Sequence, residues 1–187
     1  MAALIGPSGS GKTTLLNHLA RNFPLADNVV VSEESQSLMS GQPYTRRDFS
    51  RFGVLIGQDD VLFQGSTARE LFQFAARIKM ADCSMVAITK RVEELIENLG
   101  LQDCADTPAG GNLVSGLSGG ERKRVSIGYD LITQPKVILL DEPTSGLDSD
   151  AAFKVLKLLR RQATTTGATV LCSIHQPSSQ MAELFDQ

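Results

Sequence analysis

The segment Gly6-Pro-Ser-Gly-Ser-Gly-Lys12-Thr13 constrains the fold of this chain more than any other stretch. It matches the pattern G-x-x-x-x-G-K-[ST] at every defined position, and it follows the apolar run Ala2–Ile5. Its glycines let the backbone curl until successive N–H groups point inward at an anion. The free amides and positive dipole end of a following helix strengthen this field. The segment therefore predicts a buried strand, a phosphate-binding loop and a helix from about Lys12 to Arg21.

Length and charge narrow the class of protein. The 187 residues fit one domain with its own core. The 18 Lys and Arg against 21 Asp and Glu give a formal net charge of −3, which argues against a strongly basic nucleic-acid surface. No apolar run approaches the ~18 residues that a membrane-spanning helix needs. The start of the chain lacks a signal peptide's features, and the spacing of the three cysteines predicts reduced thiols.

Short apolar runs alternate with helical patterns along most of the chain, which is typical of an α/β domain with a mostly parallel sheet flanked by helices. Further strands are expected at Val29–Val31, Val54–Ile56, Val137–Leu140 and Thr169–Ile174. A long helix is expected from about Ser149 to Thr166, ending at Gly167, with an apolar face made of Ala152, Val155, Leu156 and Leu159.

Residues 67–133 carry helical patterns only, which predicts a helical subdomain inserted into the α/β core. The capping box Thr67-Ala-Arg-Glu70 opens its first helix, whose expected apolar stripe consists of Leu71, Phe74, Ala75 and Ile78. A second helix ends at Gly100 and carries Val92, Leu95, Ile96 and Leu99 on one stripe. A third is expected from about Gly120 to Thr133.

The loop at 6–13 predicts a nucleoside triphosphate site. Lys12 would reach the β- and γ-phosphates as a point charge, and the Thr13 hydroxyl would ligate Mg²⁺. The strand Val137–Leu140 runs into Asp141 and Glu142, at the edge where such sheets bind ligands. Asp141 would hold Mg²⁺ through water, and Glu142 would polarise an attacking water.

Gln58 and His175 each follow an expected strand, so both side chains should lie at the same edge of the sheet. A lone histidine is more often structural or solvated, but this position favours a contact with the γ-phosphate. Gln58 could reach either Mg²⁺ or the attacking water. Spacing alone leaves both assignments open.

A second Gly-rich helix start, Leu117-Ser-Gly-Gly-Glu121, forms another potential anion site. It resembles the signature motif of the ATP-binding-cassette (ABC) ATPases. Asp141-Glu-Pro-Thr-Ser-Gly-Leu-Asp148 looks like their Walker B strand running into the D-loop. Gln58 then falls on the family's Q-loop, and His175 on its switch histidine. The resemblance covers nearly the whole chain, with the motifs in the family's order.

The resemblance implies a P-loop NTPase fold and a head-to-tail dimer that holds ATP with Mg²⁺ at each shared site. The residues that it assigns to nucleotide binding in one subunit are Gly6, Pro7, Ser8, Gly9, Ser10, Gly11, Lys12, Thr13 and Thr14. The contacts from the other subunit would come from Ser118, Gly119, Gly120 and Asp148. Thr13, Gln58 and Asp141 would hold the metal, and Glu142, His175 and Gln58 would serve catalysis.

Finer motifs resemble the G subfamily of White-type and pleiotropic-drug-resistance transporters. They are Ser118-Gly-Gly-Glu-Arg-Lys-Arg-Val-Ser-Ile127, Gln58-Asp-Asp-Val61, Thr67-Ala-Arg-Glu-Leu71 and His175-Gln-Pro-Ser178. This resemblance implies an exporter of lipids, sterols or other hydrophobic small molecules. Its ATPase domain would work at the cytosolic face of a membrane, beside a second ABC ATPase domain and a transmembrane domain of the same or a partner chain. The helical insert would meet that membrane domain, with the Gln58 loop as its hinge.

The basic run Arg122-Lys-Arg124 is interpreted as a solvated helix face, with no nucleic acid expected as a partner. The family's adenine-stacking aromatic lies upstream of the first loop, and the family continues beyond Gln187, so we expect a domain truncated at both ends. One alternative is a soluble ABC-type ATPase acting on ribosomes or nucleic acid, although the gap between Lys12 and Leu117 lacks the sustained heptads of the DNA-repair versions. The other, a non-hydrolysing binding module, is disfavoured by the intact catalytic motifs.

Overall fold

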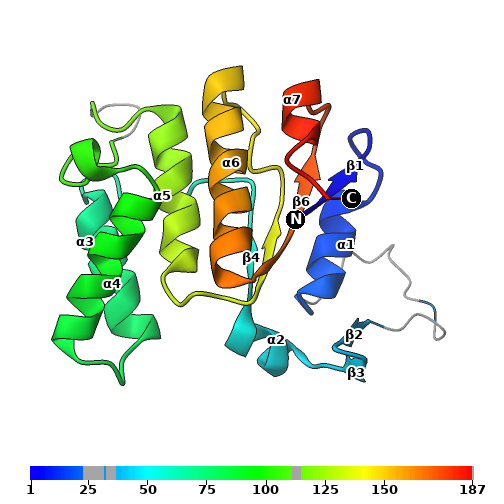
Figure 1. The fold of residues 1–187 in the computed structure, drawn as a ribbon, viewed down its shortest axis with the longest axis horizontal. Helices are drawn as coiled ribbons and strands as arrows, with labels where there is room; N and C mark the ends of the chain where they lie inside the picture. Colours follow the sequence, from blue (N-terminus) through cyan, green and yellow to red (C-terminus); the bar gives the residue numbers. More distant parts are fainter. Residues whose placement is uncertain (23–31, 33–36, 111–114, 187) are drawn as a thin grey trace.

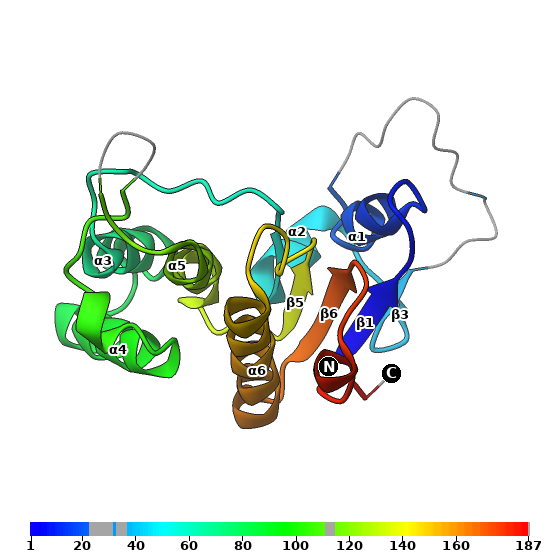
Figure 2. The same ribbon diagram turned by 90° about the horizontal axis from the view of Figure 1, so that it is seen from above.

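A parallel sheet forms the centre of the molecule. The computed structural model describes residues 1–22, 32, 37–110 and 115–186. Its main sheet contains β1 (Ala2–Ile5), β4 (Gly53–Ile56), β5 (Val137–Leu140) and β6 (Thr169–Ile174), in the order β1-β6-β5-β4. Helix α1 (Lys12–Leu19) covers one face, and α6 (Ser149–Thr166) covers the other (Figures 1 and 2). The expected α/β fold is confirmed.

The strands agree with the apolar runs of the sequence, with one correction. The expected strand Val29–Val31 lies outside the described residues. β1 is less buried than expected, and the side chain of Ile5 is 63% exposed. The reason is that β1 pairs only with β6 among the described strands, and therefore lies at an edge of the described sheet.

The sheet is surrounded by smaller elements, and the sequence patterns do not predict these. They are the hairpin of β2 (Leu38–Met39) and β3 (Gln42–Pro43), helix α2 (Arg46–Phe52) and helix α7 (Ser179–Ala182). These elements are too short for a period of 2 or 3.6 residues to become visible in the sequence.

Helices α3 (Ala68–Lys79), α4 (Met85–Asn98) and α5 (Gly119–Leu131) pack together on one side of the sheet, with the short 3₁₀ helix η1 (Gln102–Cys104) between α4 and α5 (Figure 1). The capping box of Thr67 and Glu70 opens α3 as expected. At the end of α4, Gly100 adopts φ 61°, the left-handed conformation that commonly ends a helix.

The expected apolar stripe of α3 is wrong in half of its members. Leu71 and Ala75 are buried, but Phe74 and Ile78 are 48% and 61% exposed. The buried face is completed instead by Ala68, Phe72 and Ala76. Helix α3 contacts α4 and α5 through this face, and a single sequence period could not show which apolar residues turn toward those neighbours.

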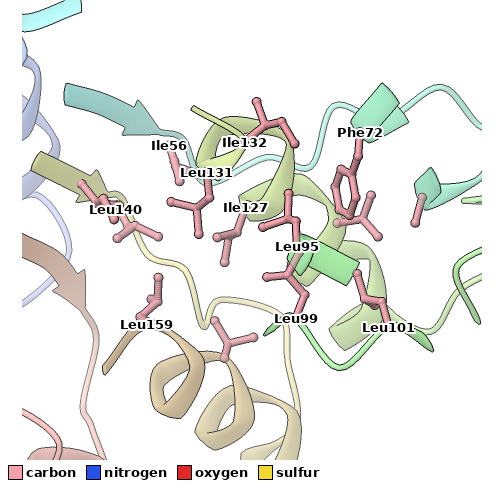
Figure 3. Close-up of a cluster of buried hydrophobic side chains, with 14 of the residues drawn as sticks. Ile56, Phe72, Leu95, Leu99, Leu101, Ile127, Leu131, Ile132, Leu140 and Leu159 are labelled. Carbon is pink, nitrogen blue, oxygen red and sulfur yellow. The ribbon is translucent and has the colours of Figure 1, made fainter. Parts of the chain in front are cut away.

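One apolar cluster joins the helices to the sheet. Figure 3 labels its large members Ile56, Phe72, Leu95, Leu99, Leu101, Ile127, Leu131, Ile132, Leu140 and Leu159. Helix α5 approaches its neighbours closely at Gly128, where an added Cβ would lie 2.4 Å from Leu99 Cδ1 and 2.6 Å from Phe72 Cζ. In the described ranges, no helix is both long and apolar enough to cross a membrane.

Candidate nucleotide-binding site

The carboxyl ends of the parallel strands bring most of the expected site residues to one edge of the sheet. In the observed register, Ile5 lies beside Ile174, and Leu140 lies between Ile56 and Cys172. The backbone N–H of Asp141 also donates to the carbonyl oxygen of Ile56 at 2.9 Å. The loop after β1, the loop after β4, the acidic pair after β5 and the histidine after β6 therefore share the edge where open α/β sheets bind ligands.

The loop after β1 has the geometry of an anion cradle. Gly9 and Gly11 adopt φ 80° and 89°, which residues with a Cβ rarely do. Helix α1 begins directly after Gly11, and no side chain caps its first turn. Each of the described helices α2 to α7 instead has a Ser, Thr or Asp side chain that accepts a hydrogen bond from a backbone N–H of its first turn. The first amides of α1 are therefore available to a phosphate oxygen.

Lys12 supplies a cation at this loop. Its Nζ donates to the carbonyl oxygens of Gly6 and Pro7, at 2.9 and 3.0 Å. The ammonium group is therefore held over the same loop whose N–H groups form the cradle. A phosphate entering the loop would meet both a fixed positive charge and backbone donors, which is the combination that binds phosphate in such loops.

Ser173 connects the two acidic residues after β5. Its hydroxyl donates to Asp141 Oδ1 at 2.6 Å and accepts from the backbone N–H of Glu142 at 2.8 Å. Ser173 is fully buried and Asp141 is 8% exposed. Glu142 adopts φ 47°, in the left-handed region. One buried hydroxyl therefore fixes both the carboxylate of Asp141 and the backbone that carries Glu142.

Sequence reasoning missed Ser173, although the sequence contains a signal for it. It is a polar residue near the end of the otherwise apolar run Val170–Ile174, two residues before His175. A buried hydroxyl in such a strand needs a hydrogen-bond partner. His175 itself lies exposed at the end of β6, at the shared edge where the sequence places it.

For the ATP hydrolysis that the sequence motifs predict, replacing Ser173 with alanine should lower the rate by about 10- to 100-fold, a usual cost of losing a supporting hydrogen bond at such a site. The change removes a donor from Asp141 and leaves the N–H of Glu142 unpaired. ATP binding by the loop at 6–13 should be little affected. The measurement is phosphate release and ATP binding by the full-length protein, with Ser50→Ala on the surface of α2 as the control. Turnover of Ser173→Ala within twofold of the parent would contradict this positioning role.

Gln58 lies next to the loop that follows β5. Its Nε2 donates to Ser145 Oγ at 3.2 Å. This bond uses the amide nitrogen, and the amide oxygen is the atom suited to a cation. The hydroxyl of Thr13, the carboxylate of Asp141 and the amide oxygen of Gln58 are hard oxygen donors of the kind that Mg²⁺ prefers, so the residues present fit this metal.

The structure does not bring Ser118, Gly119 and Gly120 to the edge of the sheet that carries the loop at 6–13. They lie at the start of α5, and α5 and α1 lie on opposite sides of α6 in both views (Figures 1 and 2). Ser118 forms a capping box with Glu121, and its hydroxyl lies 2.7 Å from Glu121 Oε2. Hydrogen bonds from the Ser118 hydroxyl and N–H lower the pKa of Glu121 below its ordinary value.

Asp148 lies beside this helix start. It caps α6 by accepting from the backbone N–H groups of Asp150 and Ala151, at 3.0 and 2.9 Å. An added Cβ at Gly120 would lie 3.0 Å from the Cβ of Ala151, so the starts of α5 and α6 are in close contact. Ser118, Gly119 and Asp148 are exposed and thus form one surface, separate from the loop at 6–13, whereas Gly120 is buried against α6.

The interpretation of Arg122-Lys-Arg124 as a solvated helix face is wrong for Lys123. This side chain is buried, and its Nζ donates to the carbonyl oxygen of Gln58 at 2.7 Å and pairs with Asp60 Oδ1 at 2.8 Å. The reason lies in helical geometry, because residue 123 shares the inward face of α5 with Ile127, one turn further on.

A glycine loop with its lysine between a strand and a helix, and an acidic pair at the end of a neighbouring parallel strand, define a P-loop nucleotide-binding domain. A family model described as "ABC transporter" matches residues 1–145, and the chain belongs to this family.

Known relatives agree with this membership. ABC transporter G family member 22 of Arabidopsis thaliana is 44% identical over 99% of this chain. G family member 1 of Dictyostelium discoideum is 42% identical over 98% of it. The chain spans 24% and 23% of these two proteins, about a quarter of their length. The solved structure of cbiO1 from Clostridium perfringens, part of the ABC transporter complex cbiONQ, has a TM-score of 0.76 at 28% identity, over 94% of this chain and 66% of that one.

Proposed function

We propose that this chain is the ATP-hydrolysing domain of a membrane transporter and works as a head-to-tail dimer. The observation that carries the proposal is the convergence of the loop at 6–13, Asp141 and Glu142 at one edge of the sheet. Together they supply hydrogen-bond donors to the phosphates, a metal ligand and a general base, which are the groups that phosphoryl transfer to water needs.

The residues take separate roles in this reaction. The amides at 8–13 and Lys12 hold the phosphates and stabilise charge that develops on their oxygens. Glu142 orients the attacking water and accepts its proton, while His175 holds the γ-phosphate and the water. Thr13, Gln58 and Asp141 hold Mg²⁺, which neutralises part of the phosphate charge when bound.

The placement of the motif at the start of α5 supports dimerisation. The surface formed by Ser118, Gly119 and Asp148 is separate from the loop at 6–13, and α6 lies between α5 and α1 in the views of Figures 1 and 2. A nucleotide bound in the loop of one subunit can reach this surface only on a partner subunit. We propose that the partner is a second ABC ATPase domain, and that Asp148 couples the paired sites.

A membrane domain is the proposed partner of the helical subdomain at about 67–133. Exposed apolar side chains lie on α3 and on the loop after β4, namely Phe74, Ile78, Val61 and Phe63, with exposures of 48, 61, 91 and 68%. Large exposed apolar side chains of this kind favour contact with another protein surface. Closure of the ATPase dimer at the cytosolic face would then move the membrane helices of an exporter of lipids, sterols or other hydrophobic small molecules.

The alternative of a soluble ABC-type ATPase acting on ribosomes or nucleic acid is less well supported. The relatives compared above are named as transporters, and they match nearly all of this chain. The formal charge of −3 also offers little attraction to a nucleic-acid backbone.

The test of the proposal is phosphate release by the full-length protein in lipid vesicles. Release should require ATP together with Mg²⁺ and should stop when EDTA removes the metal. Hydrophobic export substrates should stimulate the rate, whereas ribosomes and RNA should not. A folded, vesicle-inserted protein that releases no phosphate from ATP and Mg²⁺ would contradict the proposed function.

A further inference from the structure

We propose that Lys123 is a positioning residue that ties the start of α5 to the Gln58 loop, so that nucleotide contact at residues 118–120 is transmitted to this chain's own metal site. The inference rests on the proposed function and adds a route between the paired ATP sites. It is carried by a buried ammonium group with partners on the segment that bears Gln58.

The contacts of Lys123 are short, and its side chain is buried. Nζ lies 2.7 Å from the backbone oxygen of Gln58 and 2.8 Å from Asp60 Oδ1. The Lys123 side chain is 4% exposed, and that of Asp60 is 23% exposed. Lysine is almost never this buried unless it is paired, because removing the ammonium from water is costly. The two contacts therefore compensate for the burial of the Lys123 ammonium group.

These contacts form a continuous connection. Lys123 lies one turn beyond Gly119 and Gly120 on α5, so a movement of the helix start moves its ammonium group as well. That group holds the backbone of Gln58, while the Gln58 side chain donates to Ser145 in the loop that follows Asp141 and Glu142. Gln58 is thus held from α5 at its backbone and from the β5 loop at its side chain.

This arrangement distinguishes Lys123 from a residue that only stabilises the fold. Its partner is the backbone of the proposed metal ligand itself, and Asp60 lies only two residues further along the same loop. Losing the ammonium should therefore displace the Gln58 amide oxygen and weaken the response to Mg²⁺. The loop at 6–13 follows β1, whereas Gln58 follows β4. Affinity for ATP should therefore be largely retained.

The experiment compares Lys123→Met, Asp60→Asn and the double variant in the full-length, vesicle-inserted protein. Lys157→Met, on an exposed position of α6, makes the same chemical change and is the control. The measurements are kcat, the KM for ATP and the Mg²⁺ concentration for half-maximal activity, each per folded molecule. A thermal unfolding curve of the same preparation reports how much protein is folded.

Lys123→Met should lower kcat at least about tenfold and raise the half-maximal Mg²⁺ concentration at least about threefold, with the KM for ATP changed less than about threefold. Asp60→Asn leaves the bond to the Gln58 backbone in place and should lower kcat by about threefold. The double variant should match Lys123→Met alone, since residues in one network are not additive.

Turnover and Mg²⁺ response of Lys123→Met within twofold of the parent would overturn the proposal, even if its unfolding temperature falls. Fully additive losses in the double variant would overturn it as well. If Lys123→Met does not fold, Asp60→Asn decides, and an unchanged kcat and Mg²⁺ response in that variant counts against the proposal. Absence of ATP hydrolysis in both the parent and Lys157→Met would instead remove the proposed function, and the inference with it.

Discussion

Replacing Glu142 with glutamine is expected to lower kcat for ATP hydrolysis by about 10²- to 10⁴-fold, the usual contribution of a general base. The amide has nearly the shape of the carboxylate but cannot accept a proton from the attacking water. The backbone of Glu142 should stay in place, because Ser173 holds its N–H rather than its side chain. Binding of ATP should therefore remain within about threefold of the parent, since the loop at 6–13 is unchanged.

The measurement is steady-state phosphate release together with equilibrium binding of ATP by the full-length protein. Glu97→Gln, on the exposed face of α4, makes the same substitution away from the site and serves as the control. Hydrolysis at the parent rate in Glu142→Gln would remove Glu142 from its catalytic role. A parallel loss of ATP binding would show that the residue acts in binding instead.

Replacing Lys12 with alanine should strongly weaken the binding of ATP. The ammonium group is held over the phosphate loop by Gly6 and Pro7, and its removal takes away the charge-assisted hydrogen bonds to the phosphates. Hydrogen bonds to charged groups contribute about 1.5–3 kcal/mol each, so two of them predict a dissociation constant raised at least about 100-fold. Lys157→Ala provides the matched control on α6.

ATP binding in the absence of turnover is the measurement for this variant, made with Glu142→Gln as the common background. The Lys12→Ala protein should show no saturable binding at ATP concentrations that saturate the parent. Retained tight binding would show that the loop at 6–13 is not the phosphate site.

The parts of the fold that the sequence predicted are those that local chemistry determines. The glycines of the loop at 6–13, the capping box of Thr67 and the terminal Gly167 each specify a backbone geometry within a few residues. The buried strands β5 and β6 agree with their apolar runs to the residue. The shared edge of the sheet then follows from parallel strand order, which is why Asp141 and His175 could be placed together.

The parts that could not be predicted depend on neighbours that are distant along the chain. Phe74 was assigned to the core and Lys123 to solvent, but packing against other elements decides both positions. The role of Ser173 requires knowing that β6 lies beside β5, with Asp141 opposite the hydroxyl. The partial exposure of Ile5 likewise depends on which strands flank β1.

The central claim is that nucleotide joins the loop at 6–13 of one subunit to residues 118–120 of the partner. It is tested most directly by thiol cross-linking of the full-length Glu142→Gln protein carrying Ser10→Cys and Ser118→Cys, with the exposed Cys83 changed to serine. A short cross-linker should give a covalent dimer with ATP and Mg²⁺ and almost none without nucleotide. Neither Ser10→Cys alone nor Ser118→Cys alone should do so. A dimer yield that is independent of ATP, or no dimer in protein that binds ATP, would contradict the head-to-tail arrangement.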